Sequence, residues 1–266
     1  VSNFVGPQLA RRTTLVSVLV ISQLAALGAC LVYLAAHGGA ALGASDAAVA
    51  AVAGVGNAGG LIGFYKAAEL GPLSIAAPIG ALGAIVPVVW GISGGETVSA
   101  PEAAGLALAL GGAALVARRA DDHDEERVYP NPRAGVLWAF ASAFAFGVFL
   151  TALPEASDAN QAWALLDARI ALLVVVAAWA GRELARIRLD RGSAALTVPG
   201  LLLVAGTILY TLAVEQGQLS IVSVLGSLFP VFTVGLSVGL LDDRLSPAQA
   251  AGMVASFTGI ALIAAS

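Results

Sequence analysis

Charged residues are scarce in this sequence, and their scarcity excludes most soluble folds. Only 11% of the 266 residues are Asp, Glu, Lys or Arg, whereas a soluble domain carries about 25%. Hydrophobic residues make up 59% of the chain, and the mean hydropathy is +0.90. A soluble domain of this length has too little interior to hide so much apolar surface. The composition therefore predicts an integral membrane protein.

Residues that hold metals, form disulfides or carry catalysis are also scarce. Cys30 is the only cysteine, so no internal disulfide can form, and the only histidines are His37 and His123. The chain contains no Gly-x-x-x-x-Gly-Lys-Ser/Thr, His-Glu-x-x-His or Cys-x-x-Cys motif. A net charge of −4 without a basic patch argues against a nucleic-acid partner. We therefore expect no cofactor, no metal and no enzymatic activity.

The chain has instead a series of long apolar segments. A helix needs about 20 apolar residues to cross the hydrocarbon core of a bilayer, and nine segments meet this criterion. They span residues 15–36, 47–66, 72–93, 101–118, 133–153, 161–181, 196–214, 217–241 and 248–265. A hydrophilic linker at 120–132 divides the chain into two halves. The sequence predicts an all-α, multi-pass helical bundle.

The two halves resemble each other in sequence. Residues 69–75 read Glu-Leu-Gly-Pro-Leu-Ser-Ile, and residues 215–221 read Glu-Gln-Gly-Gln-Leu-Ser-Ile. We interpret this match as an internal duplication. The same offset aligns Gly60 with Gly206, Gly80 with Gly226 and Pro101 with Pro247. Repeats with an odd number of spans insert in opposite orientations, and transporters built in this way hold their substrate near the membrane midplane.

Several short motifs, in this order, resemble the EamA-like branch of the drug/metabolite transporter superfamily. They are Ser2-Asn3-Phe4, Leu61–Ile75, Thr207–Ile221, Asp242–Pro247 with Gly252, and a weaker copy of the last motif at Glu96, Pro101 and Gly105. The resemblance implies ten helices in two inverted five-helix repeats, at 1–119 and 133–266. It also implies transport of small metabolites, amino acids or drugs, often by export. In the repeat register Val1–Phe4 pairs with Gly147–Leu150, so most of the first helix is expected to be absent from this chain.

Arg169 is the strongest candidate for a functional residue. A charged side chain inside a membrane helix costs about 2.5–3.5 kcal/mol on insertion scales and is a functional hypothesis by default. Its partner in the repeat register is Gln23, which is also polar and also inside a span. Arg169 either faces a cavity and binds a substrate carboxylate or phosphate, or it snorkels to the interface or pairs with a neighbouring acid.

Weaker candidates lie on other spans. Asn57 has either a packing or a cavity role. Four residues at corresponding places in the two halves either line a shared cavity or lie at the membrane interface: Tyr65, Thr207, Tyr210 and Thr211. Prolines inside two repeat-equivalent helices either flank the translocation path or form static kinks: Pro78, Pro87 and Pro230. Small residues on the last span of each half indicate close helix packing or a homodimer contact: Gly105, Ala109, Gly252, Ser256 and Gly259.

The function that fits these features is secondary transport of a small molecule by alternating access, in a multi-pass protein of the plasma or inner membrane. Acidic residues that could carry a coupling proton are few, and they are Glu69, Asp167 and Glu215. Two alternatives remain: a membrane-embedded enzyme acting on lipid head groups, and a non-transporting, truncated assembly partner. The enzyme would need several acidic residues or a metal cluster on one face.

Loop charges predict the orientation of the chain. All Lys and Arg residues between spans fall on one side, whereas the loops of the other side carry only acidic charges, such as Glu96 and Glu215. The positive-inside rule places the Arg-rich side in the cytoplasm and the C-terminal Ser266 outside. The resembled family usually has both ends of its ten-helix chain in the cytoplasm, so charge and resemblance disagree. We favour charge, because loop charge decides how inverted repeats insert.

A reporter that is active only in the cytoplasm, fused after Ser266, tests this orientation. We expect it to be silent, and the same reporter placed in the 120–132 linker to be active. A strong signal from the C-terminal fusion would instead support the orientation that is usual in the family.

Overall fold

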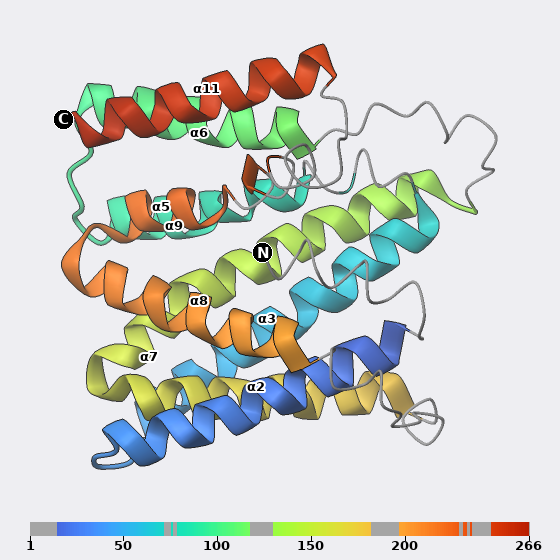
Figure 1. The fold of residues 1–266 in the computed structure, drawn as a ribbon, viewed down its shortest axis with the longest axis vertical. Helices are drawn as coiled ribbons and strands as arrows, with labels where there is room; N and C mark the ends of the chain where they lie inside the picture. Colours follow the sequence, from blue (N-terminus) through green and yellow to red (C-terminus); the bar gives the residue numbers. More distant parts are fainter. Residues whose placement is uncertain are drawn as a thin grey trace. The chain divides into compact units, whose positions relative to one another are not determined.

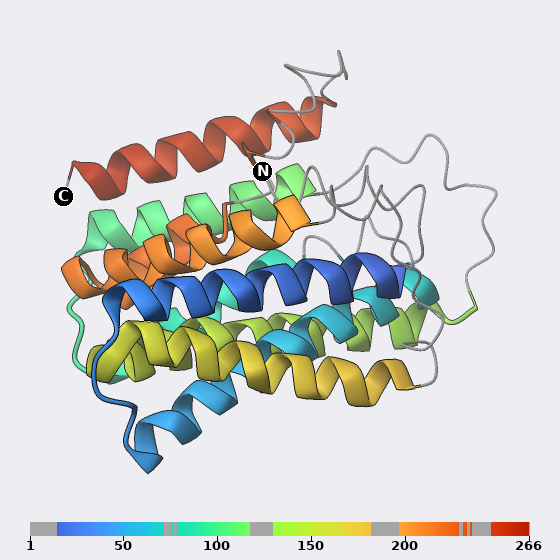
Figure 2. The ribbon, with the colours of Figure 1, turned by 60° about the horizontal axis from the view of Figure 1, so that its bottom comes forward.

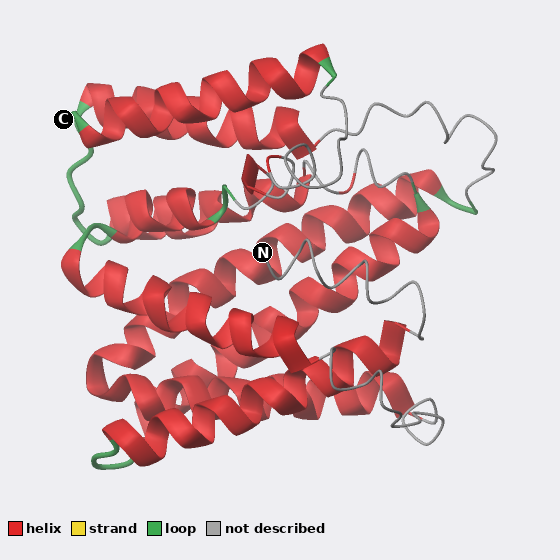
Figure 3. Ribbon diagram, in the orientation of Figure 1, coloured by secondary structure: helices red, strands yellow, loops and turns green. Residues whose placement is uncertain are grey.

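The structure, a computed structural model, describes residues 15–71, 76, 79–117, 130–181, 197–228, 231, 232, 235 and 246–265. Within these ranges the chain forms helices joined by short loops (Figures 1 and 3). Four predictions lie outside the described residues: the Ser2-Asn3-Phe4 motif, Pro78, Pro230 and Asp242–Leu245. Most of the linker at 120–132 also lies outside them.

The described helices overlap the predicted apolar segments, although the segments at 72–93 and 217–241 are described only in part. They are α2 (Leu15–His37), α3 (Ala44–Leu70), the 3-10 turn η1 (Leu82–Ala84), α5 (Ile85–Ser93), α6 (Ala100–Ala117), α7 (Pro132–Ala180), α8 (Thr197–Gln216), α9 (Leu219–Gly226) and α11 (Pro247–Ala264). The 49 residues of α7 are two helices joined at Asn160, whose φ of −166° and ψ of 107° are extended. This joint lies directly before the predicted span at 161–181.

Helix starts follow from side-chain capping. Ser246 accepts a hydrogen bond from the Gln249 backbone N–H, and the Gln249 side chain accepts one from the Ser246 N–H. This reciprocal pair is a capping box, and Pro247 at the first helical position is already restricted to a helical φ. Asn160 acts similarly, because its side-chain oxygen accepts from the Trp163 N–H, 3.2 Å away, at the start of the second part of α7.

Length and apolarity allow four of the described helices to cross a membrane: α2 over Val20–His37, α3, α7 and α8. Shorter apolar helices occupy Ile79–Ser93, Ala100–Val116 and Pro247–Ile263. Large apolar side chains point outward along these helices: Val32, Leu137, Val254 and Leu209 are 67–71% exposed. Outward-facing apolar side chains on successive helices fit contact with lipid rather than water. The predicted all-α membrane bundle is confirmed at this level, whereas the number of spans stays a prediction.

The chain divides into two compact units. Unit 1 contains residues up to Ala58 together with Thr151–Gln216, and unit 2 contains Gly59–Leu150 together with Gly217–Ser266. Each unit therefore takes segments from both halves of the sequence. The predicted repeats at 1–119 and 133–266 describe sequence similarity rather than these units, and they stay a prediction.

Unit 1 is held by helices that approach through single glycines. A Cβ at Gly54 on α3 would lie 2.2 Å from the carbonyl oxygen of Ala168 on α7. A Cβ at Gly200 on α8 would lie 2.0 Å from the carbonyl oxygen of Ser22 on α2. Side chains larger than hydrogen are excluded at both places, as is common where membrane helices pack closely.

Unit 2 uses the same device along the antiparallel pair α6 and α11, which lie side by side in Figures 1 and 2. A Cβ at Gly112 would lie 2.6 Å from the Gly252 carbonyl oxygen, and one at Gly105 would lie 2.8 Å from that of Gly259. The Ser256 hydroxyl lies 3.4 Å from the Ala109 carbonyl oxygen, to which it donates. The prediction of close helix packing is therefore confirmed, and this contact within one chain occupies the small-residue faces that also suggested a homodimer.

Pro87 lies near the start of α5, directly after the 3-10 turn η1. Proline cannot donate a backbone hydrogen bond to the residue four positions earlier, which here is Gly83. The Gly83 carbonyl oxygen faces α7, where a Cβ at Gly147 would lie 2.6 Å from it. Pro87 thus coincides with a change of helix type, and its proposed relation to a translocation path stays a prediction.

The contact between α6 and α11 predicts a loss of stability at one of two adjacent glycines and little change at the other. Gly112→Leu should destabilise the protein by about 1–3 kcal/mol or more, because its Cβ meets backbone atoms of α11. Gly111→Leu is the matched control, since nothing lies within 4 Å of a Cβ there. Thermal unfolding in detergent measures both variants. Equal losses of stability would show that the contact does not hold the pair together.

Candidate functional site

Arg169 lies near the middle of the second helix of α7. At about 1.5 Å per residue it is ~12 Å from the start of that helix at Gln161 and ~16 Å from its end at Ala180. Its side chain is only 5% exposed. A guanidinium at this depth does not snorkel to the helix end, so that alternative for Arg169 is wrong.

The Arg169 guanidinium has uncharged partners. Its Nη1 donates to Gln23 Oε1 on α2 at 2.5 Å, and the Cys30 thiol on the same helix lies beside it. Arg169 Nε has no hydrogen-bond partner although it is buried. Among the described residues the one ion pair is Lys66–Glu69. The alternative that Arg169 pairs with a neighbouring acid is therefore wrong for the described part of the chain, and one donor is left free to bind an acceptor.

Gln23 and Arg169, partners in the repeat register, thus contact each other directly. Gln23 lies on α2, and Arg169 lies on the second part of α7. Figure 2 shows α2 (blue) running alongside this part of α7 (yellow). The close approaches of unit 1 follow the same register. The offset that aligns residue 69 with residue 215 also aligns Gly54 with Gly200 and Ser22 with Ala168. The contact of Gly54 with Ala168 and that of Gly200 with Ser22 therefore exchange places under this offset.

A second polar cluster lies at the end of α2 nearest the joint in α7. Tyr33 OH donates to Gln161 Oε1, and Gln161 Nε2 donates to Thr211 Oγ1 on α8 at 2.6 Å. The His37 ring stacks on Tyr33 with the ring centroids 4.2 Å apart. A pocket of about 270 Å³ opens beside this cluster and is lined by Tyr33, His37, Asn160, Gln161 and Ala162.

The short loop between α2 and α3 closes one side of this cluster. Asn160 Nδ2 donates to the Ala40 carbonyl oxygen at 3.3 Å, and Trp163 Nε1 donates to that of Gly39 at 3.3 Å. Gly39 has a φ of 144°, which an L side chain rarely adopts. The glycine therefore lets this loop turn where both side chains can reach its carbonyl oxygens.

The other predicted site residues fall in different places. Thr207 and Thr211 lie on α8 in unit 1, where the Thr207 hydroxyl donates to the Leu203 carbonyl oxygen at 2.7 Å. Tyr210 also lies on α8. Asn57 is half-buried on the part of α3 that belongs to unit 1, and Tyr65 lies on the part that belongs to unit 2. A cavity shared by Tyr65 with the α8 residues stays a prediction.

Glu96 has a structural role that the sequence did not predict. Its carboxylate accepts from the Leu219 N–H at 2.6 Å and from the Ser220 N–H at 3.1 Å. These amides open α9, so the acid neutralises the positive end of that helix. Gly91 makes room for it, because a Cβ there would lie 2.2 Å from the carboxylate.

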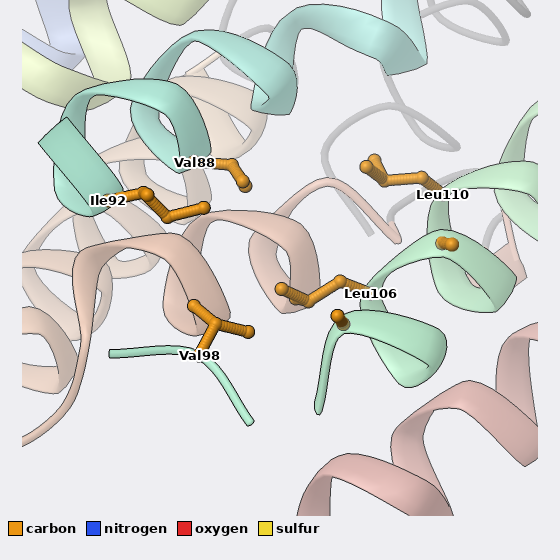
Figure 4. A pocket seen from close by; sticks show the side chains of 7 residues that line it. Val88, Ile92, Val98, Leu106 and Leu110 are labelled. Atoms are coloured by element: carbon orange, nitrogen blue, oxygen red, sulfur yellow. The ribbon is translucent and has the colours of Figure 1, made fainter. Parts of the chain in front are cut away.

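A pocket in the described residues of unit 2 is apolar. It encloses about 400 Å³ between α5 and α6. Figure 4 shows that its labelled side chains are all aliphatic: Val88, Ile92, Val98, Leu106 and Leu110. It offers no side-chain donor, acceptor or charge to a polar solute. In the described part of the chain, moreover, no three His, Cys, Asp or Glu side chains gather where they could hold a metal.

Three residues of the site were missed because their types are common in ordinary packing. Tyr33 and Gln161 lie near helix ends, where polar side chains are expected, and Cys30 lies in an apolar run. The one available signal was the position of Gln161 beside Asn160, a residue typical of a helix start.

Comparisons with known proteins agree with the sequence resemblance. The sequence model of the EamA-like transporter family matches residues 133–265. No curated protein matches the chain. One solved crystal structure, described only as that of a protein, is 17% identical, with a TM-score of 0.75, over 97% of this chain and 90% of its own. At this identity the likeness concerns the fold alone.

The contact between Arg169 and Gln23 predicts strong coupling between two substitutions. Gln23→Leu should destabilise the protein by about 1–3 kcal/mol, because it leaves a buried guanidinium without its acceptor. Adding Arg169→Met should restore part of that loss, since no buried charge then remains. Unfolding of the single and double variants in detergent gives the coupling. Additivity within about 0.5 kcal/mol would show that the two side chains act independently.

Proposed function

Because the chain belongs to the EamA-like transporter family, we propose that it is a secondary transporter that moves small metabolites, amino acids or drugs by alternating access. The observation that carries the proposal is Arg169, a buried guanidinium in mid-helix with uncharged partners and a free Nε donor. If this residue served only to stabilise the fold, an apolar side chain of similar volume would stabilise it as well or better. The cost of the charge is offset when it recognises a solute.

The chemistry of the site favours an anionic group on the substrate. A guanidinium is planar and can form two parallel hydrogen bonds with a carboxylate or phosphate. Gln23 orients the guanidinium from one side through Nη1. Nε is the donor that remains for the solute. Zwitterionic amino acids and organic acids fit this chemistry better than simple cations.

An inverted repeat fits this position of the site. The exchange of the Gly54–Ala168 and Gly200–Ser22 contacts is the pattern expected where two related halves meet across an internal two-fold axis. In inverted-repeat transporters the substrate lies near the midplane, where the repeats meet. Gln23 and Arg169, which face each other in the same register, lie at that place in the proposed arrangement. We further propose export across the plasma or inner membrane, with the Arg-rich loops in the cytoplasm.

Substitution of Arg169 tests this function. We expect Arg169→Ala and Arg169→Lys to insert and fold but to lower transport at least about tenfold in reconstituted vesicles. Lysine keeps the charge but lacks the paired donors of the fork. The assay uses a panel of amino acids, organic acids, organic phosphates and cationic drugs.

Lys66→Ala is the control, because Lys66 pairs with Glu69 at the exposed end of α3, and the variant should transport normally. Full transport by Arg169→Ala would contradict the proposed site. Absence of transport across the whole panel by the unsubstituted protein would contradict the function itself.

A further inference from the structure

Two hydrogen bonds join α2 to the second helix of α7, at different depths. Arg169 contacts Gln23 at the deeper position, and Gln161 contacts Tyr33 at the end of the helix. Gln161 and Arg169 are about two helical turns, or ~12 Å, apart. Cys30 lies between the two levels, one turn from Tyr33 along α2 and in contact with Arg169. The 270 Å³ pocket beside Gln161 therefore opens at the end of the seam that leads to the guanidinium.

The seam is closed below this pocket. Gln23 is 2% exposed, Arg169 is 5% exposed and Cys30 is fully buried. A solute that reaches Arg169 from the pocket must therefore separate α2 from α7. The Tyr33–Gln161 bond is the first polar contact that this separation breaks.

The side-chain amide of Gln161 connects α7, on which it lies, with α2 and α8 through hydrogen bonds. Its oxygen accepts from Tyr33 on α2, and its nitrogen donates to Thr211 on α8, where the Ile208 carbonyl oxygen is also within 3.4 Å. Tyr33 and Gln161 also line the polar pocket, so water or a polar solute can replace their bond when it breaks. Such hydrogen bonds can hold α2, α7 and α8 together while still allowing them to separate.

The backbone geometry at Asn160, next to Gln161, is compatible with a hinge movement between the two helices of α7. Asn160 is extended between the two helices of α7, so this point lies outside the regular helical hydrogen-bond ladder. Residues at element ends that take up changes in φ and ψ are the usual hinges of closing movements. A rotation here would carry Gln161 away from α2 and α8 while each helix of α7 stays intact.

We propose that Gln161, bonded to Tyr33 and Thr211, is the gating residue that closes the path between the pocket at Tyr33, His37 and Asn160 and the site at Arg169. The proposal rests on the proposed function, because the path matters only if Arg169 meets a solute. It adds an opening to that site and assigns it to the side of the membrane on which the Gly38–Gly43 loop lies, opposite the Arg-rich loops. In the proposed export, the solute passes the aromatic and amide side chains of the pocket after it leaves the guanidinium.

Cys30 is a built-in reporter of this gate, because it is the only cysteine in the chain and is fully buried. We expect a charged thiol reagent that does not cross membranes to label Cys30 about tenfold faster in Gln161→Ala than in the unsubstituted protein in sealed vesicles. The substitution removes the bonds to both α2 and α8, and their combined loss corresponds to roughly this shift in an opening equilibrium. The increase should occur from the side of the Gly38–Gly43 loop alone.

Ser157→Ala is the matched control, since the Ser157 hydroxyl donates only to the Leu153 carbonyl oxygen within α7, 2.8 Å away. It should leave the labelling rate unchanged. Equal rates in Gln161→Ala and Ser157→Ala, or an increase from both sides of the membrane, would overturn the proposal. If Gln161→Ala does not fold, Tyr33→Phe and Thr211→Val each remove one bond and are judged by the same criterion.

The labelling assay needs no transported solute, so the gate and the function can fail separately. Faster one-sided labelling together with no transport by the unsubstituted protein would uphold the gate and reject the transporter. Transport that depends on Arg169, combined with unchanged labelling in the Gln161 variant, would uphold the transporter and reject the gate.

Discussion

The structure of unit 1 depends on how a positive charge is kept inside an apolar helix bundle. Arg169 is buried far from either end of its helix, and among the described residues it is held by the oxygen of Gln23, beside the Cys30 thiol, rather than by a carboxylate. A carboxylate at 4 Å would neutralise the charge and bind it strongly in a low dielectric. An amide orients the guanidinium but leaves its charge available. This choice of partner makes the position suitable for binding an anion that comes and goes.

Holding these side chains in place requires close backbone contacts around them. Ser22 and Ala168 are the neighbours of Gln23 and Arg169 in sequence, and each presents its carbonyl oxygen to a glycine on another helix. The glycines at 54 and 200 therefore fix the height and rotation of α2 and α7 next to the polar pair. With larger residues at either place the helices would separate, and the guanidinium would lose its acceptor. Packing and charge placement are parts of one arrangement here.

Much of this arrangement was accessible from the sequence, and the reasons are physical. Apolar length and turn residues predicted the helices, and the rarity of intramembrane charge singled out Arg169. The register of the two halves aligns Arg169 with Gln23, and their side chains are in contact in the structure. Tyr33 and Gln161 were missed, because a polar side chain near a helix end is explained equally well by the membrane interface. Only their mutual hydrogen bond, between residues far apart in the chain, distinguishes the two cases.

The pairing of unlike residues at Gln23 and Arg169 follows from their position. Where two related segments meet at an internal two-fold axis, the residues in register face each other. Identical side chains at such a place are unfavourable when they are charged, because two guanidinium groups in contact would repel each other strongly in a low dielectric. Two glutamines would avoid the repulsion but would offer no charge to a solute. One arginine and one glutamine satisfy both requirements, since the amide oxygen accepts from the guanidinium and the charge stays single. In the proposed arrangement of two repeats, the asymmetry that substrate binding would need therefore lies where the repeats meet.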